Sequence, residues 1–271
     1  MKDSRVVLVT GTSSGFGRAI ATALADDGHR VFGTVRPPSP GAAPGYTVLP
    51  LDVTHDESVA ACVAEVVRAA GRIDAVVNNA GMGIAGAIED TSVDEAKAQF
   101  DTNFFGMHRV CRAVLPRMRA QRSGLIVNMS SLAGQVPLPF QGFYSASKFA
   151  IEAYSEALRM ELRPFGIRVA MIEPGDFATG FTAKRRMTAA HTPSSPYHGP
   201  CEQAIARMAR DEQANGDLSP VVRAVQGILE ARAPAMRYPR ATIVQRAFVA
   251  MRPFLPHPLA EYLIRDTYGL P

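Results

Sequence analysis

The feature that most constrains this sequence is the alternation of short apolar runs with longer helical patterns. Runs rich in Val, Ile and Leu predict buried strands at 5–10, 30–35, 47–51, 74–78, 125–129 and 167–172. Helical patterns separate them at 15–27, 56–70, 94–121 (two segments) and 143–163. Near-continuous apolar strands separated by helices indicate a parallel sheet covered on both faces. We therefore predict an α/β fold with a doubly wound parallel sheet in three layers, α/β/α.

The alternation stops after Pro174, and the remaining sequence has a different character. Residues 176–220 combine helical segments with several prolines, which is typical of an insertion, and we predict a helical substrate lid there. Residues 237–239 predict a last edge strand. Residues 241–271 are apolar, basic and interrupted by prolines, so we expect a C-terminal extension that packs back on the domain. The chain of 271 residues, 1–271, is predicted to be a single domain.

Composition excludes several classes of function. The three cysteines are far apart and the six histidines show no HxxxH or HExxH spacing, so we expect neither a disulfide framework nor a metal site. No basic run is interleaved with aromatic residues, which argues against nucleic acid as a partner. The chain shows neither a signal-peptide pattern nor an apolar run of the ~18–20 residues that span a bilayer. A cytoplasmic location is the simplest expectation.

The net charge of +4 is unevenly distributed, because its positive excess lies in residues 181–271. A solvated surface explains such an excess most simply. A basic tail is also compatible with an anionic cofactor, an anionic carrier or a membrane surface.

The loop after the first strand contains three glycines and opens a helix. Gly11, Gly15 and Gly17 let the backbone turn sharply and approach a ligand without Cβ clashes. The amino end of the following helix offers free N–H groups and the positive end of the helix dipole. This placement predicts a dinucleotide site at the carboxyl end of the sheet.

Further motifs follow in sequence order, each in a loop on the same predicted edge of the sheet. They are Thr10-Gly11-x-x-x-Gly15-x-Gly17, Asp52-Val53, Asn78-Asn79-Ala80-Gly81, Asn103, Ser130-Ser131, Tyr144-x-x-x-Lys148 and Pro174-Gly175 with Thr179. Together they resemble the short-chain dehydrogenase/reductase family in its compact, single-domain form, from about residue 5 to 180. The resemblance implies a Rossmann-like fold and an NAD(P)-dependent oxidoreductase. The runs around Tyr144 and Arg163-Pro164-Phe165-Gly166 are most similar to the hydroxysteroid and retinol dehydrogenase subgroup.

The resemblance also implies which residues bind the cofactor. The expected set is Gly11, Thr12, Ser13, Ser14, Gly15, Phe16, Gly17, Arg36, Asp52, Val53, Asn79, Ala80, Gly81, Tyr144, Lys148, Pro174, Gly175, Phe177 and Thr179.

Tyr144 and Lys148 are four residues apart, so in a helix they share one face. The resemblance implies that Tyr144 is the general acid/base. A free phenol has a pKa of about 10, and a neighbouring ammonium favours its ionised form. We therefore expect Lys148 to lower the pKa of Tyr144 and also to contact the nicotinamide ribose.

Two serines compete for the third role, because Ser130 and Ser131 both precede Tyr144 at nearly the family's spacing. Consecutive strand residues face opposite sides, so we assign Ser131 to the cleft, where with Tyr144 it would bind the substrate carbonyl. Ser130 is expected to make a local structural bond. The resemblance implies that Asn103 holds a water that links Lys148 to solvent, completing the catalytic set Asn103, Ser131, Tyr144 and Lys148.

The second strand ends at Val35, where an enzyme that prefers NAD usually carries an acidic residue. Arg36 follows and could pair with a 2′-phosphate, and Pro37 and Pro38 are expected to stiffen the loop that presents it. We therefore predict a preference for NADP(H), with NAD(H) as the alternative.

The predicted cleft segments are apolar, notably Met82, Ile84 and residues 132–140, which favours a lipophilic ketone or alcohol that is steroid-, retinoid- or lipid-like. One alternative is a ketoreductase for a carrier-bound or polyketide-type ketone, with Lys184, Arg185 and Arg186 docking an acidic carrier. Another is a non-enzymatic NADP-binding sensor, against which the intact Tyr144–Lys148 pair argues. The resemblance also implies a homodimer or homotetramer built on the helices near 103–119 and 143–163.

Overall fold

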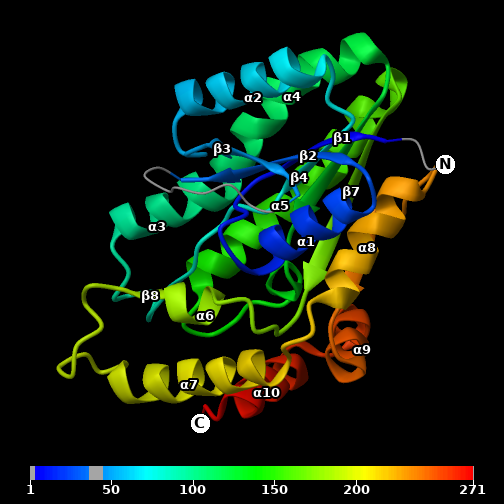
Figure 1. The fold of residues 1–271 in the computed structure, drawn as a ribbon. Helices are drawn as coiled ribbons and strands as arrows, with labels where there is room; N and C mark the ends of the chain where they lie inside the picture. Colours follow the sequence, from blue (N-terminus) through cyan, green and yellow to red (C-terminus); the bar gives the residue numbers. More distant parts are fainter. Residues whose placement is uncertain (1–3, 37–44, 271) are drawn as a thin grey trace.

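The computed structural model describes residues 4–36 and 45–270, and a seven-stranded parallel sheet lies at its centre (Figure 1). Across the sheet the strands are β3 (Thr47–Pro50), β2 (Arg30–Val35), β1 (Val6–Val9), β4 (Ala75–Asn78), β6 (Gly124–Met129), β7 (Ile167–Pro174) and β9 (Arg237–Arg240). The direction of winding reverses between β1 and β4, so the loops after these strands diverge there. The predicted doubly wound sheet and its edge strand at 237–239 are confirmed.

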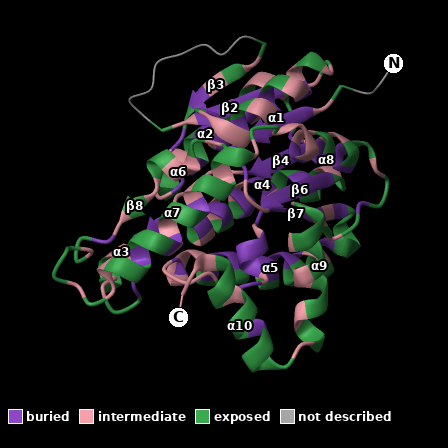
Figure 2. Cartoon of the chain, turned by 90° about the horizontal axis from the view of Figure 1, so that it is seen from below, coloured by how far each residue is buried: buried purple, intermediate pink, exposed green. Residues whose placement is uncertain are grey.

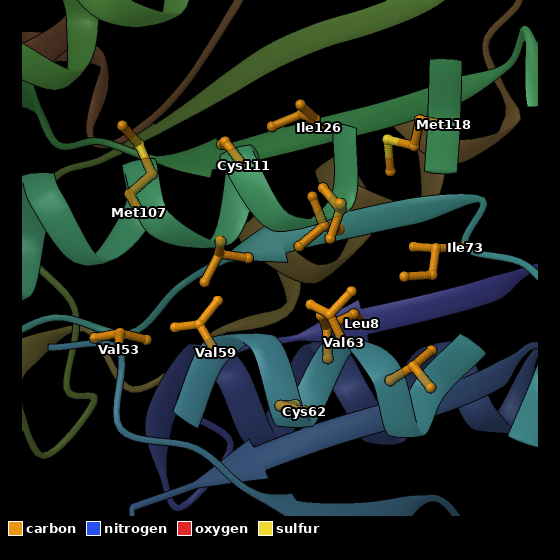
Figure 3. Packing of buried hydrophobic residues seen from close by; sticks show 14 of the residues in the cluster. Leu8, Val53, Val59, Cys62, Val63, Ile73, Met107, Cys111, Met118 and Ile126 are labelled. Carbon is orange, nitrogen blue, oxygen red and sulfur yellow. The ribbon is translucent and has the colours of Figure 1, made fainter. Parts of the chain in front are cut away.

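Helices cover both faces of the sheet, which confirms the three predicted layers. One face carries α2 (Asp56–Ala70), α4 (Gly106–Gln121) and α5 (Gly142–Leu162), and the other carries α1 (Gly15–Asp26) and α8 (Ser219–Glu230). Alternate residues of β1 serve the two cores: Leu8 packs with the first group and Val7 with the second. Figure 3 shows the first core, where Leu8 and Ile126 meet side chains from α2 and α4. Figure 2 shows the buried strands between largely exposed outer helix faces.

Local sequence explains how these helices begin and end. In α1 the buried residues Gly17, Ile20, Ala21 and Leu24 recur at helical spacing and place one apolar face on the sheet. Helix α2 carries Asp56 and Glu57 in its first turn, where they complement the helix dipole. It stops at Gly71, which adopts the left-handed conformation at φ +73°.

The predicted helical pair at 94–121 contains a turn that periodicity did not indicate. Helix α3 (Val93–Phe100) begins with a capping box between Ser92 and Glu95. A π-helical turn, Asp101–Phe105, then joins it to α4. Such a turn inserts one extra residue into the helix and often lies at a functional site. It contains Asn103, which is 2% exposed.

Beyond Pro174 the chain builds a layer over the carboxyl edge of the sheet. Helix α6 (Phe181–Lys184) leads to β8 (Arg186–Met187), which pairs in parallel with β5 (Ile84–Ala85) in a two-stranded sheet. Helix α7 (His198–Ala214) follows. Because α8 begins at Ser219, the end of the predicted 176–220 segment belongs to the layer that covers the sheet. Whether the remainder acts as a lid stays a prediction.

The C-terminal residues form α9 (Ile243–Met251) and α10 (His257–Tyr268), and α10 lies against α7 (Figure 1). Short 3-10 turns occur at Leu132–Gly134, Arg163–Phe165 and Arg252–Phe254. The three cysteines are buried and unbonded. Among the helices that the structure describes, none combines the length and the apolar character that crossing a bilayer requires.

Candidate active site

A cavity of about 850 Å³ opens at the carboxyl edge of the sheet, where the predicted motifs meet. Every predicted site residue lines it except Thr12 and Gly17. Thr12 is buried and donates its amide and hydroxyl to the Thr34 carbonyl at 2.8 and 3.2 Å. It therefore fixes the first loop to the end of β2 rather than facing the cavity.

The glycine loop is packed so closely against its neighbours that its glycines leave no space for a side chain. Gly11 and Gly15 adopt left-handed conformations at φ +72° and +56°. A Cβ atom on Gly17 would lie 2.2 Å from the Gly11 carbonyl oxygen and 2.4 Å from Nδ2 of Asn79. A Cβ on Gly15 would lie 2.7 Å from the Thr179 carbonyl oxygen. The loop is thus pressed between the turn after β4 and the segment after β7.

Asn79 holds this arrangement together. Its Nδ2 donates to the carbonyl oxygens of Thr10 and Gly11 at 2.9 and 3.0 Å. The backbone amides of Asn79 and Ala80 both donate to Oγ1 of Thr10 at 2.9 Å. Asn79 therefore acts as a clamp on the loop, in addition to lining the cavity.

The amino end of α1 faces the cavity and is available to an anion. Its N-cap, Ser14, makes no side-chain capping bond, so the N–H groups of the first turn keep their capacity to donate. Lys184 of α6 reaches across and donates its Nζ to Oγ of Ser14 at 2.8 Å. Phe16 and Phe177 meet edge to face, with ring centroids 5.3 Å apart. The residues after β7 therefore contact the glycine loop directly.

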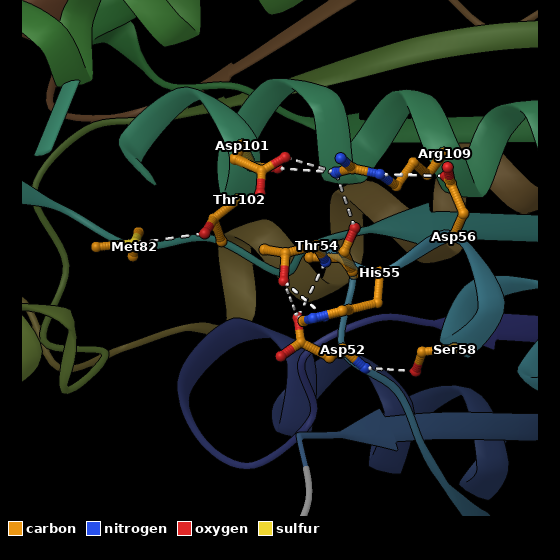
Figure 4. Close-up of polar contacts among 10 residues, drawn as sticks. Asp52, Thr54, His55, Asp56, Ser58, Met82, Asp101, Thr102 and Arg109 are labelled. Carbon is orange, nitrogen blue, oxygen red and sulfur yellow. Dashed lines mark hydrogen bonds and ion pairs between the residues drawn. The ribbon is translucent and has the colours of Figure 1, made fainter. Parts of the chain in front are cut away.

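At the other end of the loop cluster, Asp52 is fixed in orientation (Figure 4). Its Oδ1 accepts from the amide and hydroxyl of Thr54 at 2.9 and 2.7 Å. Burial alone would raise the pKa of this carboxyl, but the hydrogen bonds from Thr54 and the charges of His55 and Arg36 hold it below its ordinary value. Asp52 is thus an oriented, ionised acceptor.

Arg109 supports the same loop, and sequence analysis missed it. Its guanidinium pairs with Asp56 at 3.2 Å and with Asp101 at 2.8 Å, and it donates to the Val53 carbonyl at 3.3 Å (Figure 4). It joins α2, the π-helical turn and the Asp52-Val53 loop. Only these tertiary contacts reveal its part, because nothing in its local sequence marks it.

Arg36 is exposed and lines the cavity just beyond β2. Val35 ends the strand, and no acidic side chain follows it within the described residues of that loop. The proposed stiffening by Pro37 and Pro38 lies outside the described residues.

The hydroxyl groups of the two serines after β6 lie in different surroundings. The hydroxyl of Ser131 accepts from the Ala133 amide at 3.1 Å and donates to the Pro174 carbonyl at 3.3 Å, and it lies close enough to Tyr144 to lower the pKa of the phenol. The hydroxyl of Ser130 faces Glu152 but is buried without a hydrogen-bond partner among the described residues, so the local structural bond expected of Ser130 is not found there. Of the two, Ser131 therefore stands next to the phenol.

The electrostatics of Tyr144 and Lys148 differ from expectation. Burial raises the pKa of Tyr144 to about 12, while the Ser131 hydrogen bond opposes this shift. Burial also lowers the pKa of Lys148 to about 8, against the pull of Glu152. Lys148 donates its Nζ to the Met129 carbonyl at 2.8 Å and lies 5.7 Å from the Tyr144 ring centroid. The expectation that Lys148 acidifies Tyr144 is therefore wrong for the chain alone, because desolvation outweighs the distant charge.

Asn103 lies in the π-helical turn and binds backbone on one side and α5 on the other. It accepts from the Met82 amide at 2.8 Å and donates to the Met82 carbonyl at 3.0 Å and to Oγ of Ser147 at 3.2 Å. Ser147 in turn donates to the Tyr144 carbonyl at 2.7 Å. Ser147 was not predicted, although it is the residue that connects Asn103 to the helix carrying Tyr144.

The part of the cavity beyond Tyr144 is largely apolar, with a few acidic groups. Its apolar wall comes from the turn after β4, the segment after β6 and the C-terminal helices, through Met82, Leu132, Val136, Leu138, Val244, Phe248, Val249, Leu263 and Ile264. Ile84, which was expected there, is buried in β5 instead. Phe181 packs against Tyr144, with ring centroids 5.6 Å apart. Acidic groups also line the cavity: Asp176, Asp211, Glu212 and Asp266.

These features fit a dinucleotide. The glycine loop leaves no room for Cβ atoms where it turns, the open end of α1 suits a pyrophosphate, and Asp52 is oriented as an acceptor at the far end. Tyr144 and Ser131 line the same cavity as this loop cluster and the apolar wall.

A model of the family described as short chain dehydrogenase matches residues 5–190. The chain belongs to the short-chain dehydrogenase/reductase family. It is an NAD(P)-dependent oxidoreductase of that family, as the motifs predicted.

Several known proteins match most of this chain in sequence. A 3-ketodihydrosphingosine reductase from Bacteroides thetaiotaomicron is 39% identical over 266 residues, covering 98% of both chains. Human retinol dehydrogenase 8 is 42% identical over 193 residues, covering 66% of this chain and 61% of that protein. The crystal structure of a short-chain dehydrogenase from Streptomyces avermitilis superposes with a TM-score of 0.81, at 32% identity and 98% coverage of both chains.

The geometry predicts that Gly17→Ala weakens dinucleotide binding without unfolding the chain. The added methyl would clash with the Gly11 backbone and the Asn79 side chain. We expect the Kd for NADPH, measured by calorimetry, to rise at least about tenfold, or ~1.4 kcal/mol. Gly227→Ala in α8 is the matched control, because its Cβ would meet nothing within 4 Å. Equal binding by both variants would contradict the proposed packing of the loop.

Proposed function

We propose that this enzyme reduces the carbonyl group of a long-chain, lipid-like ketone, with Tyr144 as the proton donor. The observation that carries the proposal is the one cavity lined by the glycine loop, by an apolar wall and by Tyr144 and Ser131. The 39% identity to a 3-ketodihydrosphingosine reductase over 98% of both chains supports a lipid-like substrate.

The protonation state of Tyr144 favours reduction. With its pKa raised to about 12 by burial, the phenol keeps its proton at neutral pH. It can therefore donate that proton to the oxygen of a carbonyl as negative charge develops there. Ser131 lies close enough to the phenol to influence its pKa, and its hydroxyl could turn from the Pro174 carbonyl to donate to the same oxygen. The bound dinucleotide supplies the hydride chemistry.

Lys148 and Asn103 act through position in this proposal. Lys148 lies on the Tyr144 face of α5, where its ammonium can meet the ribose hydroxyls. A positive charge held there would stabilise the phenolate that remains after Tyr144 has donated its proton. Asn103 fixes the Met82 backbone and, through Ser147, the first turn of α5. We keep the proposal that Asn103 also holds a water that connects Lys148 to solvent.

For the cofactor, we propose a preference for NADPH. The support is local: Arg36 is exposed at the cavity and Val35 stands where an acidic residue would bind the ribose hydroxyls of NAD. An exposed guanidinium can bind a 2′-phosphate through two parallel hydrogen bonds.

We further propose that the substrate carries an amine near its ketone. Asp176 lines the cavity close enough to Tyr144 to influence its pKa, and burial raises the pKa of Asp176 itself to about 6. Glu212 is already paired with Arg185 and Thr182. Asp176 accepts a hydrogen bond from Gln245 but pairs with no cation among the described residues, so it can also receive an ammonium beside the reacting carbonyl, and such a charge would stabilise its ionised form.

The alternative of docking an acidic carrier through Lys184, Arg185 and Arg186 gains little support. Arg185 is only 3% exposed and pairs with Glu212, and Lys184 is bound to Ser14. Of the three, Arg186 alone is both exposed and unpaired by a side chain within the described residues. Assembly with a second copy stays a proposal, which the exposed apolar residues Phe149 and Met160 on α5 support.

Tyr144→Phe should stop turnover and preserve binding. Loss of a positioned proton donor costs about 10²- to 10⁴-fold in rate, so we expect kcat to fall by this range while the Kd for NADPH changes little. The rate of NADPH oxidation measures kcat, and calorimetry measures the Kd for NADPH. If turnover survives, another group donates the proton.

Arg36→Ala should separate the two cofactors. Loss of a hydrogen-bonded ion pair with the 2′-phosphate costs about 1.5–3 kcal/mol, so the KM for NADPH should rise roughly 10- to 100-fold. The KM for NADH, which lacks that phosphate, should stay unchanged and serves as the internal control. Equal changes for both cofactors would contradict the proposed preference.

Asp176→Asn tests the amine. We expect kcat/KM for 3-ketodihydrosphingosine to fall about 10- to 100-fold, the cost of a lost charged hydrogen bond. The rate with a ketone of equal chain length that lacks the amine should be almost unaffected. If both rates fall together, Asp176 has a structural part and the substrate is a neutral lipid such as retinal or a steroid ketone.

A further inference from the structure

Two histidines and a glutamate meet away from the catalytic cavity, at the start of α7. His198 is the first residue of the helix, and Glu202 lies one turn later on the same face. His191 comes from the segment between β8 and α7, where its amide donates to the Thr188 carbonyl at 3.0 Å. Turns between the two histidines bring its ring back against the helix.

The framework that carries these residues is fastened to the body of the protein. Oγ of Ser195 donates to Oδ2 of Asp90 at 2.6 Å, and the Tyr197 hydroxyl donates to Oε2 of Glu89 at 2.5 Å. The segment before α7 is therefore held in place by side chains outside it. These two carboxylates also make the surroundings acidic.

The three side chains are close enough to share one ion. One ligand atom from each of His191, His198 and Glu202 lies within 4.8 Å of the other two. Nε2 of His191 and Oε1 of Glu202 are 2.7 Å apart, and the two imidazole rings have centroids 4.7 Å apart. No basic side chain pairs with Glu202 in the described structure.

A second observation points to a ligand rather than to a simple His–Glu pair. The side chain of His191 is only 5% exposed, and its Nδ1 is buried with no hydrogen-bond partner among the described residues. Nδ1 of His198 is also buried without a partner. Buried polar atoms are nearly always paired, so two unpaired nitrogens on neighbouring imidazole rings require an explanation. A metal ion provides one, because imidazole nitrogen is among its commonest ligands.

We propose that His191, His198 and Glu202 form a binding site for a zinc-class divalent ion. Two imidazole nitrogens and one carboxylate oxygen suit Zn²⁺, whose bonds to such ligands are about 2.0–2.2 Å long, and leave a fourth position for water. Mg²⁺ and Ca²⁺ prefer oxygen ligands and fit this set poorly. Closure around the ion requires movement mainly of Glu202, which is 60% exposed, while His191 is already enclosed.

Such an ion would join the segment after β8 to α7. The same helix carries Met208 to the cavity wall, so the ion would stiffen one side of the substrate pocket. The site lies outside the predicted catalytic set, and its part is structural. The sequence expectation of no metal site followed from spacings such as HxxxH, which miss a set that combines one loop histidine with a His–Glu pair on a helix.

The test is a Zn²⁺ titration of the untagged full chain after treatment with a chelator. We expect one equivalent to bind by calorimetry, the unfolding midpoint to rise, and Co²⁺ to give the visible absorption of a tetrahedral site. Affinity should fall in acid, because a metal ion binds only neutral imidazole.

His198→Asn and Glu202→Gln should each weaken Zn²⁺ binding at least tenfold, and His191→Asn should abolish it. His257→Asn is the matched control, because His257 and Glu261 form an exposed i,i+4 pair without a second imidazole. Loss of binding in the first group with retention in the control supports the site. Absence of stoichiometric binding by the unmodified chain, or equal affinity in all variants, overturns it.

Discussion

The close approach of three loops at the carboxyl edge of the sheet is the constraint on which the rest of this structure depends. The glycine loop after β1 is packed between the Asn79-Ala80 turn and the Thr179 carbonyl, at distances that leave no space for Cβ atoms. Asn79 closes the contact with two hydrogen bonds to the loop backbone. Because parallel strands end at one edge, segments far apart in the sequence are brought to this point together. The position of the cavity follows from that packing.

Much of this arrangement could be predicted from local patterns. Apolar runs marked the strands, and the motifs that follow them marked the edge where ligands bind. The parts that could not be predicted depend on contacts between distant residues. Asn103 was foreseen, but the π-helical turn that orients it was not, since periodicity cannot distinguish a π turn from the helix around it. The roles of Arg109 and Ser147 depend on contacts with residues of other elements, which local sequence does not show. The pairing of β5 with β8 is too short to leave a sequence signal.

The pKa of Tyr144 shows the same limit. Its relation to Lys148 in the helix predicted a lowered value, but the value depends on how completely the ring is enclosed, and Phe181 contributes to that from another element. Behind Lys148 lies a second buried group, in which Arg237 pairs with Glu152 and Glu173 at 3.0 and 3.1 Å. Burial raises the pKa of Glu173 to about 7. Arg237 thus connects the edge strand β9 to the end of β7, just before Pro174.

The family match ends at residue 190, while α7, α9 and α10 supply much of the apolar wall. The residues proposed for the reaction therefore lie within the matched part, while the apolar wall draws on both parts of the chain. Mutations in the last third can reshape what fits beside Tyr144 without disturbing the hydrogen bonds that hold the glycine loop. Descendants of one ancestral chain could in this way change part of the substrate pocket while inheriting an unchanged reaction.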